Sequence, residues 1–190
     1  MHNNTITIRA EKIKDFKKID EILRSAFGDF GIHVIEEVHL IRKSRNYIPE
    51  LALVAEINGE IVGYCMLSHV QLKDNQTFHQ VMTLSPLAVL QKFQRQGIGA
   101  KLIQTSIEKS NQLDEPLIVL EGSPEYYPRF GFKYAKIYNV NIDLPHWAPK
   151  EAAMIYPLIN YESDIKGQLI YPPAFDKVNE IAHNQTSKSS

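Results

Sequence analysis

A polar, glycine-bearing turn interrupts the stretch LSPLAVLQKFQRQGIGAKLI, residues 84–103, where an apolar strand pattern gives way to an amphipathic helix pattern. The first N–H groups of a helix have no intrahelical partner, and the helix dipole favours negative charge there. Glycines permit positive φ and close approach of a ligand, while glutamine and arginine side chains can donate to phosphate oxygens. The turn therefore predicts a pyrophosphate site. Its residues are Gln94, Arg95, Gln96, Gly97 and Gly99.

Two common phosphate loops fit this turn poorly. A Walker loop ends in Gly-Lys followed by Ser or Thr, whereas Gly99 is followed by Ala100 and Lys101. A Rossmann fingerprint would need a third glycine at Leu102 and would usually follow the first strand. The alternative to a phosphate site is an ordinary helix start with no ligand.

Pro86 stands inside the strand that leads to the turn. Proline cannot donate to a ladder of backbone hydrogen bonds. Within a sheet it therefore indicates an edge strand, a bulge or a local splay. The residues alone leave these three possibilities open.

The remaining chain predicts alternating strands and helices. Apolar and polar residues alternate over residues 5–10, which predicts a strand. Residues 12–27 carry apolar side chains at helical spacing, and a second helix is predicted from Ile32 to Lys43, closed by Pro49. Asn58-Gly59 joins two β-rich runs as a hairpin, because both turn positions need positive φ. The predicted stripe is Ile13, Phe16, Ile19, Leu23 and Phe27.

A strand over residues 77–90 and a helix after the glycine turn follow the hairpin. The uninterrupted apolar run PLIVLEG is typical of a strand buried on both faces. A short helix or turn and another strand from Phe132 come next, and the proline-rich tail suits extra strands and docking loops. The order β-α-α-β-β-β-α-β-α-β indicates an α/β or α+β layer fold with a mixed sheet.

Composition narrows the class of protein. The chain of 190 residues favours a single domain, and its net charge of −1, without a basic stripe, argues against nucleic acid and membrane partners. The single cysteine excludes a disulfide framework and fits a reducing compartment. The N-terminus lacks an apolar segment. We therefore expect a cytoplasmic protein.

The pattern Gln94-x-x-Gly97-x-Gly99 resembles the pyrophosphate loop of the GNAT superfamily of acetyl-CoA-dependent N-acetyltransferases. The resemblance spans roughly residues 5–135 and implies a mixed, mostly antiparallel central sheet with helices on both faces and a splayed strand pair. It implies that Pro86 marks the splay, into which the pantetheine arm of acetyl-CoA inserts. One free N–H near Leu87 or Ala88 would then polarise the thioester carbonyl. The implied cofactor-binding residues are Leu87, Ala88, Val89, Gln94, Arg95, Gln96, Gly97, Ile98, Gly99 and Ala100.

The segment EYYPRFGF resembles the GNAT element that carries a tyrosine five residues before the aromatic of a Gly-Phe pair. This position is Tyr127, since Gly131-Phe132 follows. The resemblance implies that Tyr127 protonates the CoA thiolate, which suits a phenol with an ordinary pKa of about 10. The alternative is that Tyr126 and Tyr127 are packing aromatics.

Attack by an amine on a thioester requires a deprotonated nitrogen, so a base is expected. Glu121 is the leading candidate, at a position where a small residue is usual in this branch of the family. A relay through water, without a single base, is the alternative. The histidines and the lone cysteine show no metal-site spacing, so we expect no metal. The other candidates for the base are Glu125, His79, Glu36 and Glu37.

The sequence thus predicts an acetyl-CoA-dependent N-acetyltransferase that acts by direct attack in a ternary complex. The acceptor is a small-molecule or peptide amine, and the protein is a monomer or homodimer. We expect one domain over residues 1–185, with a core of about 5–135, a C-terminal extension of about 136–182 and a disordered tail over 183–190. The alternatives are a non-catalytic acyl-CoA-binding sensor or interaction module, and an enzyme that uses a longer acyl group.

Overall fold

The computed structural model describes residues 5–184. These residues fall into two compact units, each built from two separate parts of the chain. Unit 1 comprises Met1–Ser68 and Leu84–Ser110, and unit 2 comprises His69–Thr83 and Asn111–Ser190. Two long strands, β3 (Glu60–Asp74) and β4 (Thr77–Val89), contribute residues to both units. The domain boundaries expected from the sequence remain a prediction.

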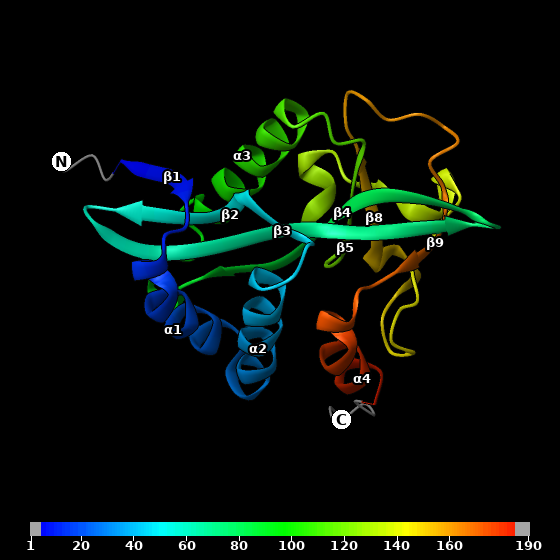
Figure 1. Ribbon diagram of the computed structural model, residues 1–190. Helices are drawn as coiled ribbons and strands as arrows, with labels where there is room; N and C mark the ends of the chain where they lie inside the picture. Colours follow the sequence, from blue (N-terminus) through cyan, green and yellow to red (C-terminus); the bar gives the residue numbers. More distant parts are fainter. Residues whose placement is uncertain (1–4, 185–190) are drawn as a thin grey trace. The chain divides into compact units, whose positions relative to one another are not determined.

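Unit 1 contains an antiparallel arrangement of β1 (Ile6–Ala10), β2 (Tyr47–Ile57) and β3. The hairpin predicted at Asn58-Gly59 is confirmed, with φ of 51° and 82° at its two turn residues. The helices α1 (Phe16–Phe27) and α2 (Gly31–Arg42) cover one face of these strands, and α3 (Ile98–Gln112) covers the opposite face (Figure 1).

Two expectations for unit 1 are wrong in detail. Ile13 does not join the buried stripe of α1, because it lies in a short 3-10 turn and is 84% exposed, whereas Ile22 is fully buried. Pro49 does not close α2, which ends at Arg42, but lies within β2. The strand tolerates the proline because its register with β3 shifts between Tyr47 and Ala52.

Unit 2 contains the second half of the sheet. The strand β5 (Leu117–Glu121) pairs in parallel with β4 and antiparallel with β8 (Ala153–Pro157), which also pairs with β6 (Lys133–Tyr134). The strand β9 (Gly167–Ile170) pairs antiparallel with β3 and in parallel with β7 (Val140–Asn141). Antiparallel pairs thus outnumber parallel ones across the two units, and the predicted mixed, mostly antiparallel sheet is confirmed.

The buried character predicted for the run PLIVLEG is also confirmed, since residues 117–120 are fully buried. The tail supplies β8, β9 and the helix α4 (Asp176–Asn184). His183 and Asn184, which the sequence assigned to a disordered tail, are the last residues of α4. The rest of that predicted tail lies outside the described residues. No helix within residues 5–184 has the length and apolar character needed to span a membrane.

The parallel ladder between β4 and β5 is short. It pairs Met82 with Ile118 and Thr83 with Val119, while β4 continues to Val89. Pro86, whose peptide bond with Ser85 is cis, lies in this continuation. The ladder between β4 and β5 therefore needs no N–H from Pro86.

The close approach of α3 to β3 depends on Gly63. A Cβ atom at this position would stand 3.1 Å from Ile98 Cγ2, 3.2 Å from Leu102 Cδ1 and 3.3 Å from the Ala88 carbonyl oxygen. These distances are at the lower limit of van der Waals contact. The absence of a side chain at residue 63 therefore allows the first turns of α3 to pack directly on the strand.

Replacing Gly63 by valine tests this packing. We expect the free energy of unfolding, measured by urea denaturation, to fall by about 1–3 kcal/mol, because the extra methyl groups overpack the core. Gly63→Ala is the matched control, since one carbon atom requires its neighbours to move by only tenths of an ångström. A valine variant as stable as the wild type would contradict the close packing.

Candidate functional site

The predicted site residues are divided between the two units. The ten predicted cofactor-binding residues belong to unit 1, and the two predicted catalytic residues, Tyr127 and Glu121, belong to unit 2. Each group forms a distinct local arrangement within its own unit.

The segment of β4 before the turn has one face less buried than the other. Leu84, Pro86 and Ala88 are buried, whereas every second residue from Ser85 onward is half-buried. Successive side chains of a strand point to opposite faces, so these half-buried residues share a face. They are Ser85, Leu87 and Val89.

The chain is fixed on both sides of the polar turn. The backbone N–H of Leu90 donates to the Val62 carbonyl oxygen at 2.9 Å, which holds the end of β4 against β3. Beyond the turn, the Ile98 side chain is 1% exposed and anchors the start of α3. Between these points the backbone has φ of 60° at Arg95 and 81° at Gly97. Of the two glycines in the motif, only Gly97 has positive φ, because Gly99 lies inside α3. The other residue of the turn with positive φ is Arg95.

The glutamine side chains brace the turn. Gln94 Nε2 donates to the Val89 carbonyl oxygen at 3.0 Å, and Gln96 Nε2 donates to the Lys92 carbonyl oxygen at 3.2 Å. The sequence predicts that both amides also donate to phosphate oxygens, and this stays a prediction. In the folded chain each amide donates to a backbone carbonyl group of the preceding segment, and one of these carbonyls belongs to Val89, a residue expected to pair with the cofactor. Each amide nitrogen carries a second N–H.

The start of α3 has the properties of an anion site. The first helical hydrogen bond runs from the Lys101 N–H to the Gly97 carbonyl oxygen at 3.0 Å, so the N–H groups of Ile98, Gly99 and Ala100 precede it. A Cβ atom on Gly97 would meet nothing within 4 Å, and Arg95 is exposed. Open space, helix-start N–H groups and a cation together fit a phosphate group.

In unit 2, the end of β5 lies beside the ring of Tyr127. A Cβ atom on Gly122, the residue after Glu121, would overlap this ring, coming within 2.8 Å of Tyr127 Cδ2. The ring also makes edge contacts with Tyr126 and Phe132, at centroid distances of 5.1 and 5.6 Å. The structure therefore brings the two predicted catalytic residues to the same end of β5.

The carboxylate of Glu121 accepts a hydrogen bond from Tyr171 Oη, with 2.8 Å between the two oxygen atoms. The Glu121 side chain is exposed to solvent, yet the protein around its carboxyl group still raises the pKa of Glu121 above its ordinary value. The hydrogen bond from Tyr171 and the nearby His183 oppose this rise in pKa, and Asp143 adds to it.

The other candidates for the base differ in burial. Glu125 and Glu36 are exposed, and His79 is half-buried in unit 2. Glu37 is only 2% exposed, and Ser85 Oγ donates to its Oε1 at 3.3 Å, which joins α2 to β4. Among residues 5–184, no group of three or more His, Cys, Asp or Glu side chains is arranged to hold a metal ion.

A cavity of about 500 Å³ lies within unit 2. Ala153, the residue opposite Glu121 in the β5–β8 ladder, lines it together with Asp143, Lys136 and Lys150. Opposite residues of an antiparallel pair share a face of the sheet. The cavity is therefore next to the strand end that carries Glu121.

Two residues of these arrangements carry no signal in the sequence. Ser85 precedes the conspicuous Pro86 but belongs to no motif of its own, and Tyr171 lies in the segment LIYPP, 50 residues from its partner Glu121. Contacts over such a separation leave no spacing pattern in a single sequence.

Comparison with known proteins gives matches in one family. The family model for the acetyltransferase (GNAT) family matches residues 16–132, which is more than half of the chain. The chain is 33% identical over 119 residues to the uncharacterized N-acetyltransferase YjhQ of Escherichia coli K12, a match that covers 63% of this chain and 65% of YjhQ. The match therefore spans slightly less than two thirds of that relative.

A second relative, the uncharacterized N-acetyltransferase YhbS of Escherichia coli K12, is 30% identical over 139 residues, covering 73% of this chain and 80% of YhbS. The crystal structure of Escherichia coli YhbS in complex with CoA superposes with a TM-score of 0.81 at 26% identity, covering 93% of this chain and 94% of that one. A GNAT family acetyltransferase from Brucella melitensis in complex with acetyl-CoA gives a TM-score of 0.73 at 25% identity, covering 92% of this chain and 100% of that one. The chain belongs to the GNAT acetyltransferase family.

Proposed function

We propose that this protein transfers an acetyl group from acetyl-CoA to an amine acceptor, by direct attack of the amine in a ternary complex. The observation that carries the proposal is the turn with positive φ at Arg95 and Gly97, which leads into the start of α3. Membership of the GNAT family and the CoA and acetyl-CoA complexes of two similar structures support the choice of donor.

Residues of unit 1 hold the donor in this proposal. The N–H groups of Ile98, Gly99 and Ala100 and the Arg95 side chain bind the pyrophosphate, since both present positive charge to open space. The backbone of residues 87–89 pairs with the pantetheine arm, and an N–H of Leu87 or Ala88 polarises the carbonyl group. Gln94 and Gln96 each keep the turn in shape with one N–H, bonded to a backbone carbonyl, and can direct the second N–H to the pyrophosphate.

Residues of unit 2 move the protons. Acetyl-CoA, when bound, supplies the acetyl group as a thioester. The acceptor nitrogen forms a bond to the acetyl carbon, and the carbon–sulfur bond breaks with its electron pair on sulfur. Tyr127 Oη gives a proton to that sulfur, and Glu121 accepts the proton that the nitrogen loses. Water later returns a proton to Tyr127 and removes one from Glu121.

Thermal unfolding with acetyl-CoA tests the donor site. At about 100 times its Kd, the ligand should stabilise the wild type by roughly 2.7 kcal/mol, which corresponds to roughly 5–10 °C for a chain of this size. Gly99→Glu should abolish the shift, because its carboxylate takes the place of the phosphate at the helix start while favouring the helix itself.

Gly99→Ala is the matched control and should keep most of the shift. A folded wild type without any shift would overturn the proposed function, and the turn would be an ordinary helix start. A shift that persists in Gly99→Glu would mean that acetyl-CoA binds elsewhere.

Tyr127→Phe tests the proposed acid. We expect kcat to fall by about 100-fold, in the usual range for the loss of a general acid, with an unchanged Kd for acetyl-CoA by calorimetry. Turnover is followed as CoA release that depends on an added amine, with Tyr126→Phe as the control that should retain activity. Unchanged turnover would remove Tyr127 from the mechanism. If no amine promotes CoA release from a wild type that binds acetyl-CoA, the protein is a non-catalytic acyl-CoA-binding module.

A further inference from the structure

The C-terminal segment brings a phenol to the end of β5. Tyr171 follows β9 directly, and its Oη donates to Glu121 Oε1 at 2.8 Å. The two residues are 50 positions apart, and Tyr171 belongs to the part of the chain that the sequence identified as an extension to the core. The extension therefore makes a direct polar contact with a proposed catalytic carboxylate.

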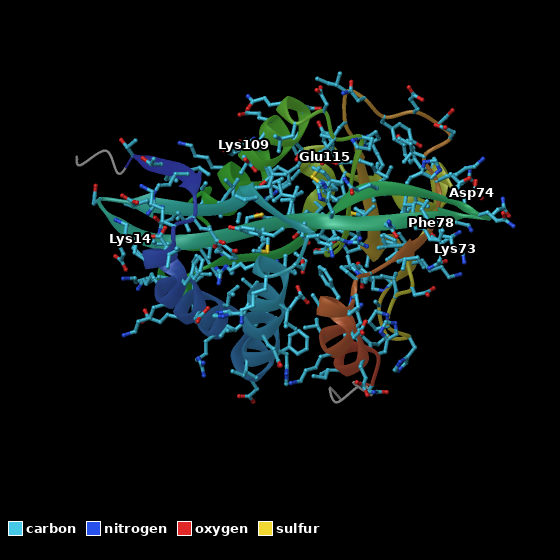
Figure 2. The ribbon with its side chains drawn as sticks, in the orientation of Figure 1. Lys14, Lys73, Asp74, Phe78, Lys109 and Glu115 are labelled. Atoms are coloured by element: carbon cyan, nitrogen blue, oxygen red, sulfur yellow. The ribbon has the colours of Figure 1, made fainter. Side chains whose placement is uncertain are left out.

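The strand before Tyr171 is firmly attached within unit 2. The register pairs Ile170 with Gln71, Leu169 with Leu72 and Gln168 with Lys73. At the start of β9, Gly167 has φ of 122°, and a Cβ atom there would overlap the Lys73 carbonyl group and come within 2.9 Å of the Asp74 nitrogen. Figure 2 labels Lys73 and Asp74 at the end of β3. This contact fixes where Tyr171 emerges from the strand.

The chain after Tyr171 is also attached. The Tyr171 ring lies 5.0 Å from the ring of Phe175, centroid to centroid, and Phe175 is 2% exposed. Further along, Trp147 Nε1 donates to the Ala182 carbonyl oxygen of α4 at 3.1 Å. Ring packing and the held helix restrict the movement of the Tyr171 side chain, so its hydroxyl group is directed to a defined point.

The groups around Glu121 have opposite effects on the pKa of its carboxyl group. The protein that surrounds the carboxyl group and the charge of Asp143 raise the pKa of Glu121, whereas the Tyr171 hydrogen bond and His183 of α4 lower it. A hydrogen bond to the ionised form of a carboxyl group favours that form. Tyr171 of the extension and His183 at the end of α4 therefore favour an ionised Glu121, whereas Asp143, which also lies in the extension, opposes it.

We propose that Tyr171 is a positioning residue that orients the Glu121 carboxylate, and that the C-terminal extension is thereby part of the acetyl-transfer centre. The inference rests on the proposed function, in which Glu121 accepts the proton of the acceptor amine. An ionised, oriented carboxylate can take that proton, whereas a protonated one cannot.

Titration of the Glu121 carboxyl carbon by NMR tests the proposal on the protein alone. The signal is assigned with Glu121→Gln. Tyr171→Phe keeps the ring beside Phe175 and removes only the hydroxyl group, so the pKa of Glu121 should rise further than in the wild type. Tyr161→Phe is the matched control, because this tyrosine of unit 2 packs against the Tyr138 ring at 5.8 Å and should leave the Glu121 titration unchanged.

The dependence of stability on pH gives a second readout. A hydrogen bond that lowers the pKa of Glu121 in the folded protein contributes stability above that pKa and loses it as the pH falls through the pKa. The loss of unfolding free energy caused by Tyr171→Phe should therefore be larger at pH 8 than at pH 4. A purely structural contact would give the same loss at both pH values.

An unchanged Glu121 pKa in Tyr171→Phe, or a loss of stability that does not vary with pH, would overturn the proposal. These results are independent of the thermal shift with acetyl-CoA. If acetyl-CoA binds but Tyr171→Phe leaves the Glu121 titration unchanged, the role of Tyr171 fails and the proposed function stands. If the titration moves but the wild type does not bind acetyl-CoA, the proposed function fails and the positioning role fails with it.

Discussion

The close packing of α3 on β3 at Gly63 determines the geometry of the polar turn. With no side chain at residue 63, Ile98 and Leu102 lie against the strand and the Ala88 carbonyl group, so the start of α3 has a fixed distance from β4. The end of β4 is fixed as well, through the bond from the Leu90 N–H to Val62. The chain between must reverse in a short span, and it does so through positive φ at two positions. The helix start consequently faces open space.

The turn keeps its shape through its own side chains. Gln94 and Gln96 each donate to a backbone carbonyl group, while the N–H groups that begin α3 and the exposed side chain of Arg95 are donors for an anion. Backbone donors keep a fixed direction and lose little conformational freedom when they bind a ligand. The motif residues thus act in two ways, since the glutamines brace the loop and the glycine opens it.

Local signals in the sequence were sufficient for most of the fold. The structure contains the strands predicted from three local patterns: the alternation of apolar and polar residues, the Asn58-Gly59 turn and the apolar run before Gly122. Each of these patterns depends only on neighbouring residues. The failures depend on tertiary context. Ile13 is apolar yet exposed, and Pro49 is accepted by a shift of register in β2. The contact of Tyr171 with Glu121 likewise arises only when the chain folds, so no spacing predicts it.

Glu121 and the C-terminal extension are best understood together. Residues 117–120 of β5 are fully buried, and Glu121 at the next position is exposed, but the protein around its carboxyl group still raises its pKa. A small residue would avoid that cost. A glutamate there needs a donor, and the extension supplies one in Tyr171, on a strand held by the close contact at Gly167. The carboxylate of Glu121 and the phenol of Tyr171, 50 residues later, are thus joined by a hydrogen bond through which each stabilises the position of the other.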